Sequence, residues 1–260
     1  MLTDHQVQSF QAHGFVKGGR VLSDAQVEEL RGEIERVIAD RDKPGRQPVL
    51  LHNFAKTPGQ IVWQIVNIWQ ASAPFRALVH HRQIVEEIAQ LTGAKEIRLW
   101  HDQIQFKPAE TGGVNMWHQD WPYWPILAAP HQVTAWVALD DVDPENGCMS
   151  MVPGSHRWGN NIDFLHQLPA FDQMPAEFAG RPLAVRPCPV RKGEVHYHHA
   201  LTWHGSPANR SGRPRRAIAL HYMTDQTRYH AAGNHVMKKF VTVADGAKLE
   251  GEAFPLVWPA

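Results

Sequence analysis

The chain has 260 residues, of which 43% are hydrophobic and 20% are charged, so it carries enough apolar side chains to bury a full core. Lysine and arginine number 26, as do aspartate and glutamate, and the resulting net charge of zero gives no electrostatic reason to expect a nucleic acid or an anionic membrane as partner. The sequence has no run of 18 apolar residues and no basic-then-apolar leader, and we therefore expect a cytoplasmic protein.

The cysteines and histidines bear on redox and metal chemistry. Cys148 and Cys188 form no CxxC unit, so they are either one disulfide or, as expected in the cytosol, two reduced and inert thiols. The 17 histidines indicate metal or proton chemistry only where they cluster at ligand spacing. We expect most of them to be scattered over the surface.

The N-terminal third is predicted to be helical. Thr3 or Asp4 can cap a first helix that runs to about Ala12, and Ser23 can cap a second helix that ends before the DKPG turn at 42–45. A third helix is predicted over about 77–91, ended by Thr92-Gly93. The segment between the second and third helices has little clear periodicity.

After residue 95 the pattern changes to short runs typical of strands, with breaks marked by Pro, Gly, Asn and Asp. The predicted strands cover 96–107, 114–119, 131–139, 148–152, 183–187, 194–205 and 215–223. Many short strands in sequence indicate a sandwich or barrel. The long connection at 158–182 has the length that is typical of a lid.

These elements predict one domain over residues 1–260. Residues 1–95 form a helical layer with an irregular insert, residues 96–225 form the β core, and residues 226–260 form a C-terminal extension. The predicted fold class is mainly β with N-terminal helices.

A candidate metal site begins with His118 and Asp120, which point to the same side of an extended strand. Imidazole and carboxylate ligands suit Fe(II), and three of them on one octahedral face leave positions open for substrate and O₂. The pair needs a third ligand from elsewhere in the fold, and the best candidate is His204, followed by a Gly-Ser turn. Three histidines lie just upstream as competitors or as residues that orient a ligand: His196, His198 and His199.

A candidate anion site lies on the last predicted strand. Arg215 shares one strand face with Ala217, Ala219 and His221, so its side chain can reach into a cavity that the alanines leave open. The planar guanidinium binds a carboxylate through two hydrogen bonds. The alternative is that Arg215 and Arg216 both face solvent.

Taken together, these residues resemble the phytanoyl-CoA dioxygenase family of Fe(II)- and 2-oxoglutarate-dependent oxygenases. The resemblance covers roughly residues 3–225. Its motifs are the opening Leu2–Phe10 that leads to Gly14-Phe15-Val16, His118-x-Asp120, the hairpin Asp141–His156, His204-Gly-Ser, and Arg215.

The resemblance implies a double-stranded β-helix, a jelly roll of the cupin kind. It also implies His118, Asp120 and His204 as iron ligands, and Arg215 as the partner of the distal carboxylate of 2-oxoglutarate. Further cosubstrate contacts are expected from Gln105, Lys107, Thr134 and Trp136. The alternatives left open are that Lys107 is a solvated strand end and that Trp136 is a core residue.

The implied reaction is oxidation of a small organic molecule by O₂, coupled to conversion of 2-oxoglutarate to succinate and CO₂. Iron and cosubstrate carry the chemistry, so no general acid or base is assigned. Related halogenases replace the acidic ligand by a small residue. Asp120 is retained here, and hydroxylation or another oxidation without halide is therefore expected.

Aromatic residues near the metal motif are candidates for the substrate pocket. The predicted lining comprises Trp121, Tyr123, Trp124, Asn53 with its neighbours His52 and Phe54, and Trp158. The alternative is that the aromatic residues simply pack their loop onto the sheet.

Two other functions remain open at the level of the sequence. One is a cupin-like metal-binding or sensor protein without turnover, and the other is a metal-dependent enzyme that does not use 2-oxoglutarate. The residue pattern fits a natural product, an amino-acid derivative or a lipid as substrate. It leaves open the oligomeric state and the choice among hydroxylation, desaturation and ring formation.

Overall fold

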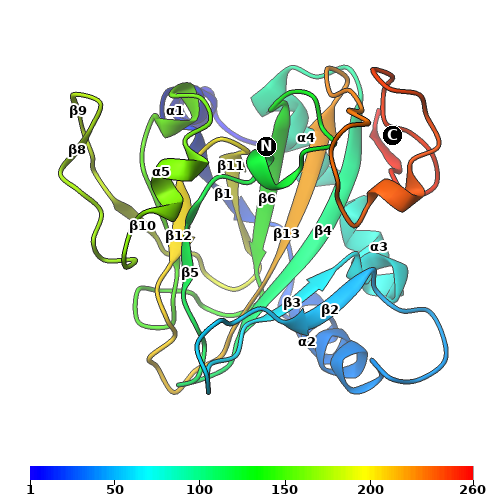
Figure 1. Ribbon diagram of the computed structural model, residues 1–260. Helices are drawn as coiled ribbons and strands as arrows, with labels where there is room; N and C mark the ends of the chain where they lie inside the picture. Colours follow the sequence, from blue (N-terminus) through cyan, green and yellow to red (C-terminus); the bar gives the residue numbers. More distant parts are fainter. Residues whose placement is uncertain (260) are drawn as a thin grey trace.

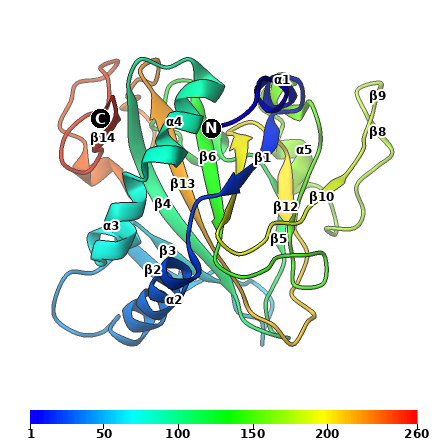
Figure 2. The ribbon, with the colours of Figure 1, turned by 180° about the vertical axis from the view of Figure 1, so that it is seen from behind.

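The computed structural model describes residues 1–259, which form two facing antiparallel sheets with helices behind the larger one (Figures 1 and 2). The helices are α1 (Asp4–His13), α2 (Asp24–Ala39), α3 (Ala73–Val79), α4 (Arg82–Thr92) and α5 (Ile162–His166). Short 3₁₀ turns include η2 (Trp121–Tyr123) and η4 (Lys238–Phe240). The mainly β fold with N-terminal helices is confirmed, while the division of the chain into layers stays a prediction.

The larger sheet has the strand order β1-β11-β6-β13-β4-β3-β2, and β14 pairs with the end of β4. Its strands are β1 (Phe15–Arg20), β2 (Leu50–Asn53), β3 (Trp63–Val66), β4 (Ile97–Lys107), β6 (Gln132–Ala138), β11 (Glu194–His199), β13 (Arg215–Thr224) and β14 (Leu256–Trp258). The smaller sheet has the order β10-β7-β12-β5. Its strands are β5 (Asn115–His118), β7 (Met149–Met151), β10 (Arg186–Cys188) and β12 (His204–Ser206), and a separate hairpin pairs β8 (Glu177–Phe178) with β9 (Arg181–Pro182).

The two faces of the larger sheet bury different cores, as the period of two along a strand requires. On β13, Ile218 and Leu220 belong to the cluster that packs the sheet against the helices. Ala217 and Ala219 belong to the cluster between the two sheets. The small residues leave space between the sheets, and Figure 2 shows α2, α3 and α4 in front of the opposite face.

Three predicted elements differ from the structure. The predicted helix over 77–91 is two helices, α3 and α4, separated at His80–His81. The irregular stretch before it contains β2 and β3, which extend the larger sheet beyond β4. The predicted strand over 194–205 is also divided, because β11 pairs in the larger sheet and β12 pairs in the smaller one.

The crossing from β11 to β12 is held by the end of α1. Gly14 caps that helix with φ of 84°, a conformation that glycine adopts without strain. Its carbonyl oxygen accepts hydrogen bonds from the His199 backbone N–H and the Thr202 hydroxyl, each at 2.8 Å. A Cβ at Gly14 would lie 2.7 Å from the Thr202 hydroxyl oxygen, so a side chain there would push the crossing away.

Within residues 1–259, no helix is long and apolar enough to span a bilayer. Both cysteines are free and buried, which agrees with the expectation of reduced thiols. The cytoplasmic location stays a prediction.

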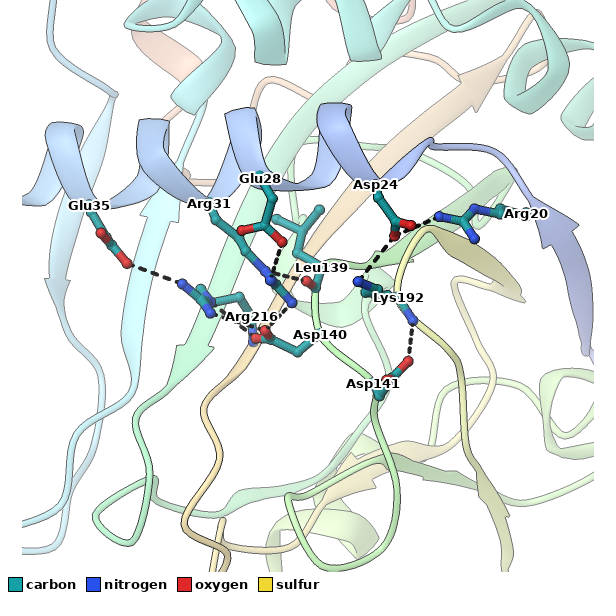
Figure 3. A network of polar contacts seen from close by, with 10 residues as sticks. All are labelled: Arg20, Asp24, Glu28, Arg31, Glu35, Leu139, Asp140, Asp141, Lys192 and Arg216. Atoms are coloured by element: carbon teal, nitrogen blue, oxygen red, sulfur yellow. Dashed lines mark hydrogen bonds and ion pairs between the residues drawn. The ribbon is translucent and has the colours of Figure 1, made fainter.

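Helix α2 is fastened to the larger sheet through one buried carboxylate (Figure 3). Asp140 accepts a hydrogen bond from Arg31 of α2 at 2.6 Å and two from the guanidinium of Arg216, each at 3.0 Å. Asp140 is 7% exposed, so these charges are largely shielded from water. Arg216 therefore lies on the helix side of β13, opposite to Arg215.

We expect Asp140→Asn to lower the free energy of unfolding by about 3 kcal/mol, because it leaves two arginines without their buried counter-charge. Urea denaturation of the variant and the unchanged protein measures this difference. Asp24→Asn is the matched control, since Asp24 pairs with Arg20 and Lys192 at the surface of the same helix. Equal effects of the two substitutions would contradict the role given to Asp140.

Candidate metal centre

The smaller sheet brings His118 and His204 side by side. His118 is the last residue of β5, His204 is the first residue of β12, and the two residues pair directly across the strands. Asp120 follows two residues after His118, where its backbone N–H donates to the carbonyl oxygen of Ala200 at 3.0 Å. One possible ligand atom from each of the three side chains lies within 4.8 Å of the others, so together they can hold a metal ion.

Both imidazoles are oriented by the backbone. The Nδ1 atoms of His118 and His204 lie 2.7 Å and 2.9 Å from the carbonyl oxygens of Met116 and Thr202. Because a carbonyl oxygen only accepts, each Nδ1 carries the proton and each Nε2 has a free lone pair. The Nε2 atoms point to Oδ1 of Asp120, at 3.9 Å from His118 and 3.5 Å from His204. This tautomer and orientation suit metal ligation.

The other carboxylate oxygen of Asp120 is held by the larger sheet. Thr134 Oγ1 donates to Oδ2 at 3.1 Å, and His198 Nε2 lies 3.1 Å from the same atom. Thr134 also lies 2.7 Å from Nδ1 of His221. Asp120 therefore presents Oδ1 to the two histidines and keeps Oδ2 for its supporting contacts.

The three side chains have the protonation states that a metal requires. Burial lowers the pKa of both His118 and His204 to about 4, so both are neutral at pH 7. Burial raises the pKa of Asp120, but His204, His198 and His221 lower it by more, and the net pKa lies well below its usual value. The site thus offers two neutral nitrogen ligands and one anionic oxygen ligand.

A second charged group lies at the opposite end of the space between the sheets. The guanidinium of Arg215 is buried and donates to the Gly147 carbonyl at 3.2 Å, the Gln105 carbonyl at 3.1 Å and the Ser206 hydroxyl at 3.0 Å. Lys107 is also buried, and its Nζ lies 2.7 Å from the same Ser206 hydroxyl. The cationic side chains of Arg215 and Lys107 therefore contact the same hydroxyl group.

These two cations have no carboxylate partner among the residues that the structure describes. Burial lowers the pKa of Arg215 to about 10, and burial and Arg215 together lower the pKa of Lys107 well below its usual value. Unpaired buried charge is unfavourable, and a bound carboxylate would compensate it. The end of the cavity near Ser206 is therefore suited to one carboxylate of a dianion.

A cavity connects the metal-binding residues to Ser206. It is lined mainly by polar side chains: Gln103, Gln105, Asn115, His118, Asp120, Trp136, Met149, His198, His204, Gly205, Ser206, Ala219 and His221. The predicted cosubstrate residues Gln105 and Trp136 thus lie on its wall. Lys107 lies behind Ser206 and is no solvated strand end, and Thr134 lies behind Asp120.

The structure distinguishes the three upstream histidines. His198 contacts Asp120, whereas His196 stacks on Phe15 at a centroid distance of 5.8 Å. The ring of His199 accepts a hydrogen bond from the Leu201 backbone within the crossing between the sheets. Sequence alone could not separate them, because His196 and His198 share a strand face.

The predicted substrate residues do not come together around the cavity. Tyr123 is 48% exposed and its ring lies 6.0 Å from the His118 ring, beside the metal-binding residues. Trp124 is buried against Trp100 and His221, and Trp121 packs against the same cluster. These two tryptophans pack the loop onto the sheet, which is the alternative that the sequence left open.

The remaining predicted residues lie farther from the cavity wall. The side-chain oxygen of Asn53 accepts from the Val62 backbone N–H, and His52 and Phe54 beside it are exposed. Trp158 packs edge-on against Trp203 in a separate core cluster beneath the smaller sheet. Four further residues line the cavity without having been predicted as pocket residues: Ser206, Asn115, Gln103 and Met149. For Ser206, the sequence offered one indication of its role: it lies two residues after the predicted metal ligand His204.

The donor set fits a non-haem iron together with a dicarboxylate cosubstrate. Two histidines and one carboxylate are the ligands of the facial Fe(II) site, and the unpaired cations lie where a distal carboxylate would reach.

The model of the family "Phytanoyl-CoA dioxygenase (PhyH)" matches residues 10–217 of this chain. The chain belongs to this family. Peroxisomal phytanoyl-CoA dioxygenase of Bos taurus is 24% identical over 247 residues, which cover 88% of this chain and 71% of that protein. Methylphosphonate hydroxylase of Gimesia maris is 29% identical over 222 residues, which cover 85% of this chain and 80% of that protein.

Solved structures agree with the fold. The non-haem α-ketoglutarate-dependent carbocyclase SnoK from nogalamycin biosynthesis superposes with a TM-score of 0.80 at 29% identity, covering 98% of this chain and 96% of SnoK. The epimerase SnoN from the same biosynthesis superposes with a TM-score of 0.77 at 26% identity, covering 98% of this chain and 97% of SnoN. The double-stranded β-helix is confirmed.

Family membership also decides the class of protein. This member of the phytanoyl-CoA dioxygenase family is an Fe- and 2-oxoglutarate-dependent oxygenase, as the sequence predicted. The enzyme is favoured over the sensor without turnover and over a metalloenzyme that uses no 2-oxoglutarate.

We expect Thr134→Val to weaken Fe(II) binding about tenfold, because it removes a hydrogen bond to the carboxylate of Asp120 without changing the side-chain shape. Titration calorimetry under argon measures the dissociation constant. Thr242→Val, at an exposed threonine, is the control and should bind iron normally. Normal binding by Thr134→Val as well would mean that Asp120 needs no support from β6.

Proposed function

We propose that this enzyme hydroxylates a small organic molecule with O₂ and converts 2-oxoglutarate to succinate and CO₂. His118, Asp120 and His204 hold the iron, and Arg215 and Lys107 bind the distal carboxylate of 2-oxoglutarate. The observation that carries the proposal is one cavity with a two-histidine, one-carboxylate group at one end and Ser206 at the other, where the buried cations Arg215 and Lys107 contact the Ser206 hydroxyl from behind the wall.

Iron and 2-oxoglutarate, when bound, supply the activation of O₂ and the oxidation of the substrate. The chain provides the geometry. The backbone carbonyls of Met116 and Thr202 fix both imidazoles, and Thr134 and His198 hold Asp120. Because these contacts are already made in the protein, the ligands need little reorganisation when the metal binds.

The length of the cavity sets the orientation of the cosubstrate. Ser206 joins both cations and lies on the cavity wall two residues after His204. A dicarboxylate with one end at Ser206 therefore has its 2-oxo acid end near the metal ligands. Gln105 and Trp136 line the space between the two ends and are proposed as contacts along the cosubstrate.

The similar proteins act in different ways. Their names describe hydroxylation of methylphosphonate, oxygenation of phytanoyl-CoA, carbocyclisation and epimerisation. Ring formation or epimerisation is the second candidate for this enzyme, because SnoK and SnoN superpose over 98% of the chain. Among the predicted pocket residues, Tyr123 is the one we propose as a wall beside the metal, since its exposed ring adjoins His118.

The enzyme loaded with Fe(II) should release succinate from 2-oxoglutarate in the presence of O₂, even slowly without its substrate. Succinate is measured by NMR or mass spectrometry. His204→Ala removes one of three ligands and should abolish this release together with tight iron binding. Equal succinate release by His204→Ala would contradict the assigned ligand set.

We expect Arg215→Gln to weaken 2-oxoglutarate binding roughly 100-fold and to leave Fe(II) affinity unchanged, because the charge lost belongs to the carboxylate end of the cavity. The visible absorption of the Fe(II)–2-oxoglutarate complex under argon reports this binding. Arg210→Gln, at an exposed arginine five residues earlier, is the control. Unchanged 2-oxoglutarate affinity in Arg215→Gln would exclude Arg215 as the anchor.

A further inference from the structure

A row of uncharged amide side chains lies on and behind the cavity wall, on the side where β4 pairs with β3. Gln103 and Gln105 come from β4, Gln64 comes from β3, and Asn115 comes from β5 across the cavity. Gln64 pairs with Gln105 in the sheet, so their side chains are on the same face. Gln103 lies two residues from Gln105 and therefore shares that face.

Hydrogen bonds link these amides in two separate sets, one from His52 through Gln64 to Gln103 and one between Asn115 and Gln105. Gln64 Nε2 donates to Gln103 Oε1 at 3.0 Å, and His52 Nε2 lies 2.7 Å from Gln64 Oε1. Asn115 Nδ2 donates to Gln105 Oε1. The carbonyl oxygens of Gln103 and Gln105 are thus occupied, whereas their Nε2 groups have no hydrogen-bond partner within residues 1–259. Both amides line the cavity. Because Gln105 is assigned to the cosubstrate, the Nε2 group of Gln103 is the donor available to the substrate.

The charged side chains around the cavity already have partners in the proposed function, namely the metal and 2-oxoglutarate. Its described lining contains no lysine or arginine, and its carboxylate, Asp120, belongs to the metal-binding group. The two nearby cations are buried behind Ser206 at the end given to 2-oxoglutarate. An anionic substrate would lose its hydration here without gaining a counter-charge, which is strongly unfavourable. Unpaired amide donors favour neutral oxygen acceptors instead.

We propose that the amide row binds an uncharged substrate rich in hydroxyl, ether or carbonyl oxygens, and that Gln103 is the residue which selects it. This inference rests on the proposed function, because it assigns the substrate to the same cavity. It separates this enzyme from a relative named for methylphosphonate, an anion. Gln103 has this role because its amide lies on the cavity wall and is positioned from behind by Gln64.

The test uses the full chain loaded with Zn(II), which supports no turnover, and saturated with 2-oxoglutarate. Two fragment sets of matched size serve as probes in ligand-observed NMR. One set contains methyl glycosides, inositols and lactones, and the other contains carboxylates, phosphonates and sulfates. We expect the uncharged set to bind and the anionic set to give no signal.

Variants at Gln103 then test whether its amide selects the uncharged fragments or whether these fragments merely fit into the cavity. Gln103→Leu should weaken binding of the uncharged fragments about tenfold, because hydrogen bonds from the amide are lost while its volume is nearly kept. Gln103→Arg places a cation on the wall and should make anionic fragments bind. Gln226→Leu, at an exposed glutamine in the turn after β13, is the matched control and should bind like the unchanged protein.

Anionic fragments that bind the unchanged protein as tightly as the uncharged ones would overturn the proposal. It would also be overturned by an uncharged set that stays silent, or whose binding is the same in Gln103→Leu. Failure of the proposed function is distinguishable, because it would appear earlier, as absent binding of 2-oxoglutarate to the metal-loaded protein. Each variant is accepted only if it binds 2-oxoglutarate as the control does.

Discussion

The carboxylate of Asp120 joins the two sheets of the protein. Its Oδ1 faces the two histidines of the smaller sheet, and its Oδ2 is held by Thr134 and His198 of the larger sheet. Its backbone N–H is bonded to the segment that crosses from one sheet to the other. A buried carboxylate needs such partners, because unpaired it would be strongly destabilising. The packing of the two sheets and the geometry of the metal-binding group therefore depend on the same contacts of Asp120.

The same cavity separates charge along its length. One end has an anionic and two neutral ligands for a dication, and the other end has two cations without a partner. A dicarboxylate that chelates the metal satisfies both ends at once. The space between the two ends is lined by small or uncharged side chains, including Ala219 and Gln103. These side chains carry no charge that would weaken the electric field between the two ends. The proposed direction of the cosubstrate and the proposed uncharged substrate both rest on this distribution of charge.

The helical layer contributes to the site from a distance. The carbonyl oxygen of Gly14, at the end of α1, holds the crossing that carries His204 into the smaller sheet. Helix α2 is fastened through Asp140 to Arg216, the neighbour of Arg215 on β13. Arg215 and Arg216 thus have different roles, because successive residues of a strand point to opposite faces of the sheet. Arg216 fixes a helix to the outer face, and Arg215 contacts Ser206 of the cavity wall from behind.

Local rules in the sequence determined a large part of this protein. The capping residues Thr3 and Ser23 follow from local capping preferences, and the shared face of Arg215 and Ala219 follows from the period of a strand. His118 and Asp120 were correctly paired from their spacing, although β5 ends at His118 and Asp120 is the N-cap of the turn η2. The family motifs in their order were enough to identify the oxygenase class.

Only the tertiary structure decided which distant residues meet. Whether His198 or His196 supports Asp120, whether Trp124 lines the cavity or packs the core, and whether Lys107 is solvated or joins Arg215 depend on pairing between strands far apart in the chain. The amide row also arises this way, since Gln64 and Gln103 are brought together by the pairing of β3 with β4. Side-chain period is a local property, whereas strand register is set by the packing of the whole core, and for this reason the sequence could propose these residues but not assign them.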